Sequence, residues 1–532
     1  MALTIVEIVV VAVMSCLGSI RYVHVLQMNR YQVPAYSQWL SRNRNRMVFE
    51  NVVLGFAASL LSIYLPVLLS MFINGERIRN NLCFWLVLLL FTAVTGYIAW
   101  RDYNAPSKKP FVITKRIRRF AGVLLAVCVL AAILIRAVGM PSYFVFAAVE
   151  YLVWFVALII NPYENKLNAG FFKSARQKIR KRKDLITIGI TGSFGKTNVK
   201  FILRDMLAKR YRVLATPASF NTAMGISRVI NDDLTDEHEV FIAEMGATHV
   251  GDIKELVDLV RPKYGILTSI GKRHMDTFGS MENIVTTKYE LIQGLPKESG
   301  FAVFGSGDDY IDRLFAMCRK EKCRVSVDPK VEAFMKAEQI TYGEKGTSFV
   351  MVCEDGGRIS CRTPLLGIFN VKNILLAAAL ARKLGLEMGE IAEAARKLKP
   401  IEHRLQLIPG ETNVIDDTLN EDPDGAFEAM HVMAQMPGRR IVVTPGLGEL
   451  GSREAEVNYA LGTVMADSAD TVILVGDQNS QRGIRRGLLQ SGFSRSNLHA
   501  VEDMEDASEL LEELSEAGDT VLFESSPSED EE

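Results

Sequence analysis

Three glycines, two threonines and a lysine stand close together in the segment 189–197, whose letters are GITGSFGKT. A β-branched run precedes this segment and a helix-like run, 198–209, follows it. Backbone N–H groups at such a strand–turn–helix junction can hold phosphate oxygens. We therefore predict a nucleotide-binding P-loop made of Gly192, Ser193, Phe194, Gly195, Lys196 and Thr197. Lys196 would place a cation near the β- and γ-phosphates, and Thr197 would offer a hydroxyl to Mg²⁺.

The P-loop is a variant, because Ile190 stands where the commonest spacing has a glycine. An ordinary glycine-rich turn between a strand and a helix is the alternative interpretation. The agreement of strand, loop, Lys-Thr pair and helix favours nucleotide binding.

Alternating strands and helices must position this loop. Strand-like runs at 186–190, 240–244, 264–270 and 301–304 alternate with helix-like runs at 199–210, 253–260 and 284–295, and an Ala- and Leu-rich helix at 372–384 closes the set. This pattern predicts an α/β nucleotide-binding domain over 185–398 with a mainly parallel sheet. Strand-like runs at 412–415, 440–444, 471–475 and 520–523 predict a second, Rossmann-like α/β domain over 399–524. Residues 525–532 are predicted to form an acidic tail.

The first third of the chain has a different composition. Five apolar runs, at 3–20, 52–73, 82–100, 120–138 and 143–160, approach or exceed the roughly 20 residues that a helix needs to cross a bilayer. They predict a helical transmembrane bundle over 1–165 in a multi-pass protein of the cell membrane. We find in these runs no clustered polar residues of the kind that marks a transport path.

Lysine and arginine predict the orientation of these spans. The loops 21–46 and 101–119 and the segment 166–183 are basic, whereas 74–81 carries only Arg77 and Arg79 and 139–142 carries no basic residue. The positive-inside rule then places the N-terminus outside and the α/β domains in the cytoplasm. The linker 166–184 includes seven basic residues between Lys173 and Lys183. This linker either contacts anionic lipid headgroups or is a solvated connection between the two parts of the chain.

Net charge and cysteine spacing say little about the function. A net charge of −1 gives no sign of a nucleic-acid partner, and we predict none. The seven cysteines lack the paired spacing of a zinc site. Oligomeric state cannot be inferred from these features.

The chain resembles the Mur ligase family. The resemblance starts with the P-loop, Asn221 with Gly225, Glu244-Met245-Gly246, His274 and Lys288. It continues through the segments 367–373, 403–404, 416–423 and 448–451. It covers about 184–523, and within the family it is nearest to the branch that adds D-alanyl-D-alanine.

The resemblance implies ATP-dependent amide formation through an acyl phosphate. Two anions must approach each other, so cations must neutralise them. The resemblance assigns one Mg²⁺ to Thr197 and a second to Glu244 and His274, stabilisation of the transferring phosphoryl group to Lys196, and a place beside the γ-phosphate to Asn221. Lys288 would be carbamylated and support the metal, although a plain surface lysine is the alternative. Asn373 would meet adenine, Arg404 the phosphates and Asp417 the ribose.

Departures from the family pattern bear on the substrates. Phe369 replaces the histidine of a His-Asn pair, Ser269 replaces a common asparagine, and Ser306-Gly307 begins a modified aspartate turn. Glu524-Ser525-Ser526 stands in place of Lys-Gly-Ser, which puts the incoming amine in doubt. No segment before Asp184 resembles the family's UDP-binding domain.

The predicted function is that of a membrane-anchored ligase in peptidoglycan precursor assembly. Its partners would be ATP, a UDP- or lipid-linked carboxylate acceptor, an amino acid or dipeptide, and membrane lipid. A poly-amino-acid or precursor-modifying ligase is the alternative of the same class. A membrane scaffold or transport protein that uses its nucleotide domain as a switch is the alternative of another class.

Overall fold

The structure is a computed structural model that divides into two compact units, Met1–Gly170 and Phe171–Glu532, called here the helical unit and the α/β unit. It describes residues 2–29, 31–43, 48–73, 75–105, 111–218, 220–271, 275–400, 402–418, 423–448, 450, 453–476 and 478–524. The predicted acidic tail, 525–532, lies outside these ranges.

The helical unit is built from long apolar helices joined by short ones. In chain order its elements are α1 (Ala2–Gly18), α2 (Ile20–Met28), α3 (Val33–Asn43), α4 (Val48–Leu69), α5 (Glu76–Tyr103), α6 (Lys115–Ala137), the 3₁₀ helix η1 (Ser142–Ala148) and the first part of α7 (Val149–Lys181). Among the described residues, five helical stretches are long and apolar enough to cross a membrane. This agrees with the five predicted runs.

Polar side chains of α2, α4 and α7 meet inside the helical unit, and only one of them, Glu150, lies within a predicted apolar run. The Asn51 amide donates to the Tyr22 hydroxyl and lies 3.5 Å from Oε2 of Glu150. Asn51 and Glu150 are both buried. The sequence did not reveal this cluster because its members come from three separate helices.

The first sheet of the α/β unit has nine strands in the order β2-β3-β1-β4-β5-β6-β7-β8-β9. The strands are β1 (Ile186–Thr191), β2 (Val213–Ala215), β3 (Val240–Glu244), β4 (Tyr264–Leu267), β5 (Phe301–Phe304), β6 (Glu321–Ser326), β7 (Met335–Gly343), β8 (Gly346–Cys353) and β9 (Arg358–Thr363). Neighbouring strands are parallel from β2 across to β7, whereas β8 runs antiparallel to β7 and to β9. The antiparallel edge was not predicted from the sequence.

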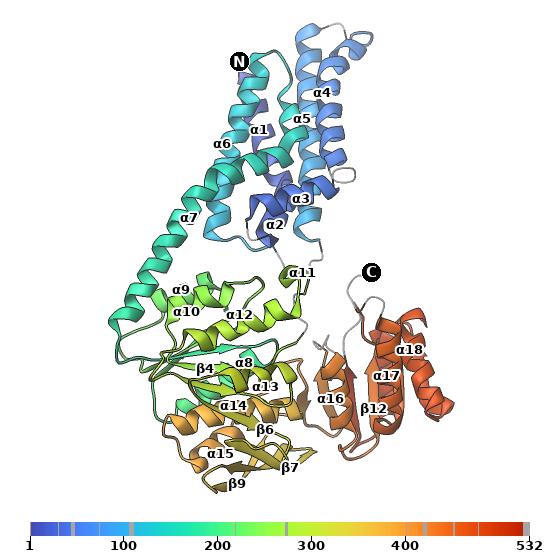
Figure 1. Ribbon diagram of the computed structural model, residues 1–532. Helices are drawn as coiled ribbons and strands as arrows, with labels where there is room; N and C mark the ends of the chain where they lie inside the picture. The colour runs from blue at the N-terminus through green and yellow to red at the C-terminus, as the bar shows by residue number, and fades with distance from the viewer. Residues whose placement is uncertain are drawn as a thin grey trace. The chain divides into compact units, whose positions relative to one another are not determined.

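Helices cover both faces of this sheet (Figure 1). They are α8 (Lys196–Leu207), α9 (Ala223–Asp232), α10 (Asp252–Val260), α12 (Met281–Gly294), α13 (Asp309–Met317), α14 (Ile368–Lys383) and α15 (Met388–Arg396). The short helix α11 (Met275–Phe278) contacts α12. Buried residues of α8, α14 and α15 form one core with the sheet. Those of α9, α10, α12 and α13 form a second core on the opposite face. The P-loop helix α8 thus packs in the same layer as α14.

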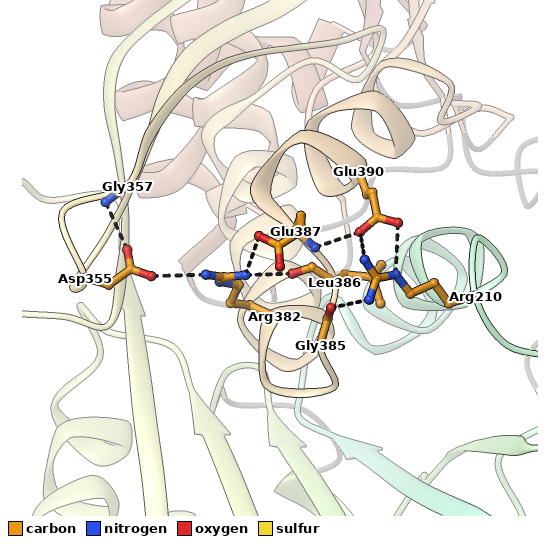
Figure 2. A network of polar contacts seen from close by, with 8 residues as sticks. All are labelled: Arg210, Asp355, Gly357, Arg382, Gly385, Leu386, Glu387 and Glu390. Carbon is orange, nitrogen blue, oxygen red and sulfur yellow. Dashed lines mark hydrogen bonds and ion pairs between the residues drawn. The ribbon is translucent and has the colours of Figure 1, made fainter.

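An ion-pair network fixes the turn after α14 (Figure 2). Arg210, just after α8, donates to both carboxylate oxygens of Glu390 at 2.9 and 2.6 Å and to the Gly385 carbonyl oxygen at 2.6 Å. Arg382 pairs with Asp355 and Glu387. Exposed pairs of this kind stabilise a fold by less than about 1 kcal/mol each. Their effect is to hold α14 and α15 in register with the end of α8.

The second sheet has six strands in the order β10-β11-β15-β12-β13-β14, and only β10 is antiparallel to its neighbour. Its strands are β10 (Gln406–Ile408), β11 (Asn413–Asp417), β12 (Arg440–Thr444), β13 (Thr471–Val475), β14 (Leu498–Val501) and β15 (Thr520–Glu524). The helices beside them are α16 (Pro423–Met433), α17 (Glu454–Ser468), α18 (Gln478–Gln490), η3 (Arg495–Asn497) and α19 (Met504–Leu514). The two α/β domains are confirmed, while their predicted boundaries and the Rossmann-like assignment stay predictions.

Candidate active site

The candidate site lies at the carboxyl ends of β1 and β3. These strands are parallel neighbours in which Ile190 pairs with Glu244, so the P-loop after Thr191 starts beside the Glu244 carboxylate. The Thr191 hydroxyl donates to the Met245 carbonyl oxygen at 2.9 Å, which ties the two strand ends together. Ligands of open parallel sheets bind at such strand ends.

Glycine is required twice in the P-loop. A Cβ atom on Gly192 would lie 1.9 Å from the Thr268 hydroxyl oxygen. Gly195 has φ +77°, and a Cβ atom there would lie 2.5 Å from Oδ1 of Asn373. Asn373, which is distant from Gly195 along the chain, therefore packs directly against the P-loop.

Lys196 folds back over the loop that precedes it. Its Nζ donates to the carbonyl oxygens of Gly192 and Ser193 at 2.9 and 3.1 Å. The cation is thus held above the backbone that would cradle a phosphate, where it can counter phosphate charge.

Glu244 is the most highly connected acid of the site and is 1% exposed. Its Oε2 accepts from the Thr197 hydroxyl at 3.0 Å and from Lys200 Nζ at 2.9 Å. Its Oε1 accepts from the Asn221 amide at 3.3 Å. The structure thus brings together three of the predicted residues, Thr197, Asn221 and Glu244. Hydroxyl and carboxylate oxygens are the ligands that Mg²⁺ prefers, so this set fits the ion implied by the resemblance.

Lys200 is a site residue that the sequence reasoning missed. Its side chain is fully buried and pairs with Glu244, and burial lowers the pKa of its ammonium group while the Glu244 charge opposes that shift. Its Nζ also donates to the carbonyl oxygen of Ala218 in the loop that leads to Asn221. The signal available in the sequence was its spacing, since Lys200 lies one helical turn after Lys196 on α8.

Of two other predicted residues, the structure describes Lys288 but not His274. Lys288, on α12, is 5% exposed and donates to the Gly192 carbonyl oxygen at 2.9 Å, so it is not a surface lysine. His274 lies outside the described residues. Within the described ranges, no group of three His, Cys, Asp or Glu side chains is arranged to hold a metal ion. All three predicted metal ligands, Thr197, Glu244 and His274, thus stay predictions.

A cavity of about 530 Å³ lies beside the P-loop helix. Asn198 and Phe201 of α8, Asn370 of α14 and the cations Lys399 and Arg404 are among its lining residues. Two of these lining residues are in contact, since the Asn198 amide donates to Oδ1 of Asn370 at 3.1 Å. A polar and cationic lining suits a nucleotide, and it places Arg404 on the same side of the sheet as the P-loop helix.

Asp417 ends β11 and lies close to this cavity. It is 5% exposed, and its Oδ1 accepts from the backbone N–H of Leu405, the residue after Arg404, at 2.7 Å. Glu524 stands at the position of the missing lysine and is buried. It lies opposite Asp417 in the parallel register of β11 and β15. The Thr444 hydroxyl donates to Oε2 of Glu524 at 3.1 Å. This strand end therefore carries acidic groups where the family pattern has a cation.

Comparison with known proteins follows the same division of the chain. Residues 190–381 match the Mur ligase middle domain, and residues 403–526 match the Mur ligase glutamate ligase domain. The UDP-N-acetylmuramoyl-tripeptide–D-alanyl-D-alanine ligase of Treponema pallidum is 31% identical over 345 residues, which are 65% of this chain and 72% of that protein. Its Escherichia coli counterpart is 29% identical over 305 residues, 57% of this chain and 67% of that protein.

Solved structures resemble about two thirds of the chain. MurF ligase from Thermotoga maritima in complex with ADP aligns with a TM-score of 0.58 and 24% identity, covering 68% of this chain and 80% of that one. MurF from Acinetobacter baumannii aligns with a TM-score of 0.57 and 23% identity, covering 68% and 77%. At this identity the likeness concerns the fold.

Proposed function

Because the chain belongs to the Mur ligase family and is an ATP-dependent ligase, we propose that it joins an amine to a membrane-presented carboxylate of a peptidoglycan precursor. The observation that carries this proposal is the contact of Thr197, Lys200 and Asn221 with one buried carboxylate, Glu244, directly beside the P-loop. A nucleotide switch without chemistry would not need this set of donors.

The residues of this chain divide the reaction between them. Lys196 counters the charge of the phosphates while an oxygen of the acceptor carboxylate attacks the γ-phosphorus and the bond to the β-phosphate oxygen breaks. Bound Mg²⁺, with Thr197 as a ligand of one ion and Glu244 of the other, would neutralise the phosphate oxygens. Asn221 can orient the acceptor beside Glu244. The amine then attacks the acyl carbon, loses a proton and displaces phosphate, which leaves an amide.

The nucleotide would run from the P-loop to the cavity beside α8. Asn373, which packs on Gly195, would contact adenine, Arg404 the phosphates and Asp417 the ribose. ADP in the Thermotoga maritima relative supports this use of the fold. We propose two Mg²⁺ ions, with Glu244 and His274 holding the second and a carbamylated Lys288 supporting it.

The acceptor and the amine follow from different evidence. The relatives' name points to D-alanyl-D-alanine as the amine and to a UDP-linked tripeptide as their acceptor. Here five apolar helical stretches occupy the N-terminal part. We therefore propose a lipid-linked acceptor, met at the cytoplasmic surface of the cell membrane.

The test is ATP turnover by the full chain in detergent. Amino acids and dipeptides are offered together with UDP-linked and lipid-linked acceptors, and ADP and amide product are both measured. We expect turnover that needs an acceptor, an amine and Mg²⁺, with the lipid-linked acceptor preferred. Lys196→Ala should abolish it. Turnover in that variant, or ATP hydrolysis that ignores every acceptor and amine, would reject the proposed chemistry.

A further inference from the structure

The fifth apolar stretch of the helical unit is not a single α-helix. It begins as η1 (Ser142–Ala148) and becomes α-helical only from Val149. A 3₁₀ helix rises about 2 Å per residue, more than the 1.5 Å of an α-helix. A few residues of η1 therefore cover more depth than the same number would in α7.

Packing inside the unit makes this unusual segment tolerable. Ser142, Tyr143 and Phe146 of η1 are buried, and the Ser142 backbone N–H donates to Oε1 of Glu7 in α1 at 2.9 Å. Backbone that is not α-helical is tolerated at membrane depth when protein surrounds it and satisfies its polar groups. Buried Glu7 thus has a structural role at the start of η1.

Glycines let η1 approach its neighbours closely. A Cβ atom on Gly18, the last residue of α1, would lie 2.5 Å from the Phe146 ring. One on Gly55 of α4 would lie 2.8 Å from Ala147. The chain consequently passes, within η1, from the level of Glu7 to the end of α1.

Glu150 and Glu164 lie near the two ends of the first part of α7, and both residues contact the same end of the helical unit. Glu150 lies 3.5 Å from the amide of Asn51, which is in the first turn of α4. Fourteen residues later, Glu164 accepts from Arg119, near the start of α6, at 2.7 Å. Both α4 and α6 begin on the side that the basic loops assign to the cytoplasm.

Residues of α7 between Glu150 and Glu164 also contact the segment that follows α2, which the basic loops assign to the cytoplasmic side. The Trp154 ring N–H donates to the Ser37 hydroxyl of α3 at 3.0 Å, and the Asn161 amide donates to the Tyr31 carbonyl oxygen at 2.9 Å. Residues 150 and 164 are separated by about 21 Å along an α-helix. A helix that crossed the bilayer would carry them to different depths, whereas these partners lie at one depth.

The opposite face of this part of α7 is apolar and exposed. Its members, 43–55% exposed, are Tyr151, Phe155, Leu158, Ile159 and Tyr163. The buried members, such as Val153, Val156 and Ile160, face the helical unit. Two tyrosines among large apolar side chains are typical of the membrane–water interface.

We propose that residues 149–164 of α7 lie along the cytoplasmic surface of the bilayer, with Tyr151, Phe155, Leu158, Ile159 and Tyr163 inserted at the boundary of headgroups and acyl chains. The fifth crossing is then made by residues 138–148, of which the last seven form η1. The occupant of the exposed face is lipid, because the face is at the level where α4 and α6 leave the bilayer. This inference rests on the proposed membrane anchoring.

The test measures depth with nitroxide labels on the full chain in vesicles that contain anionic lipid. Single cysteines replace Tyr151, Phe155, Ile159 or Tyr163, and reference labels replace Val53 or Leu60 on the exposed face of α4. The chain without added cysteine gives the background from its own thiols. Collisions with oxygen and with a water-soluble nickel chelate report depth. Because each label sits alone at an exposed position, loss of one variant leaves the others.

We expect the four α7 labels to contact lipid at nearly equal depth. The Leu60 label should lie about 10 Å deeper than that at Val53, as expected for a spanning helix. A steady change of depth from 151 to 163, by up to about 18 Å, would show that α7 spans the bilayer and would overturn the inference. The inference would also be overturned if the α4 labels collide with oxygen in lipid while the α7 labels collide only with the nickel chelate or with neither reagent. If the α4 labels are also outside lipid, membrane anchoring itself fails.

Discussion

At the scale of single residues, the site is organised around the carboxylate of Glu244. Thr197, Lys200 and Asn221 all donate to it, and only Lys200 brings a full positive charge. Lys200 also donates to the Ala218 carbonyl oxygen, and Ala218 has φ +42°, a conformation unusual for alanine. One buried lysine thereby holds both the acid and the loop that leads to Asn221.

Lys200→Met should destabilise the α/β unit strongly. The change leaves Glu244 as a buried carboxylate without its counter-charge, which costs about 3–5 kcal/mol. The double variant Lys200→Met with Glu244→Gln should recover much of this loss. Denaturant unfolding of the wild type, the two single variants and the double variant measures the coupling free energy between Lys200 and Glu244. Equal losses in Lys200→Met and in the double variant would contradict the ion pair as the cause.

Lys288 should act as a negative group once carbamylated. Carbamylation needs a neutral amine, and Lys288 is buried beside the P-loop where the carbamate would face the metal. Lys288→Ala should lose ligation and regain part of it when short carboxylic acids are added, because they can occupy the vacated space. Lys288→Arg should be inactive and stay so, since it keeps a positive charge and fills the space. Full activity of Lys288→Arg would mean that no carbamate supports the metal.

At the scale of elements, one helix of the second sheet contacts the start of α14. Glu428 of α16 accepts from the backbone N–H of Ile368, the first residue of α14, at 2.6 Å and from the Tyr342 hydroxyl at 3.3 Å. A carboxylate at a helix N-terminus is stabilised by the free N–H groups there. Because α14 carries Asn370 and Asn373, this contact links the second sheet to the helix beside the P-loop.

Glu428 should make the stability of the α/β unit depend on pH. Burial raises the pKa of this carboxyl above its ordinary value of 4.5, with its hydrogen bonds opposing the shift. A raised pKa means that its contribution is complete below the unfolded value and is lost as pH rises through the folded value. Glu428→Gln should therefore melt near the wild-type temperature at pH 5 and progressively above it toward pH 8. Glu512→Gln, on the exposed surface of α19, is the control. A melting difference that is the same at every pH would contradict this.

At the scale of the whole molecule, the chain joins an apolar helical unit to a ligase of two α/β domains. The two Mur ligase family models match residues 190–381 and 403–526, which lie in the α/β unit. The five apolar helical stretches lie before the residues that these models match. They are the basis for expecting a membrane-presented acceptor.

The orientation of the chain should follow the alternation of its basic loops. A tag placed after Asn104 or after Lys183 should be protected from a membrane-impermeant reagent in intact cells, whereas a tag at Asn74 should react. Permeabilised cells, in which all three tags should react, are the control. Labelling of the Lys183 tag from outside would invert the topology and remove the α/β unit from cytoplasmic ATP.

Local patterns in the sequence sufficed for the parts of the fold that depend on neighbours along the chain. The P-loop between β1 and α8 is one example, because strand, glycine turn and helix signals are contiguous. The five apolar runs are another, because membrane crossing depends on length and composition. The alternation of strands and helices likewise predicted α/β domains, although α14 begins at Ile368, earlier than predicted.

The remaining features depend on contacts between distant segments. Lys200 and Glu244 are 44 residues apart, and only the parallel pairing of β1 with β3 brings them together. The packing of Asn373 on Gly195 requires α14 to lie in the same layer as α8. The division of the fifth apolar run into η1 and α7 depends on Glu7, Gly18 and Gly55, which lie in other helices. A hydropathy pattern records how apolar a segment is, but its direction relative to the bilayer is decided by the side chains against which it packs.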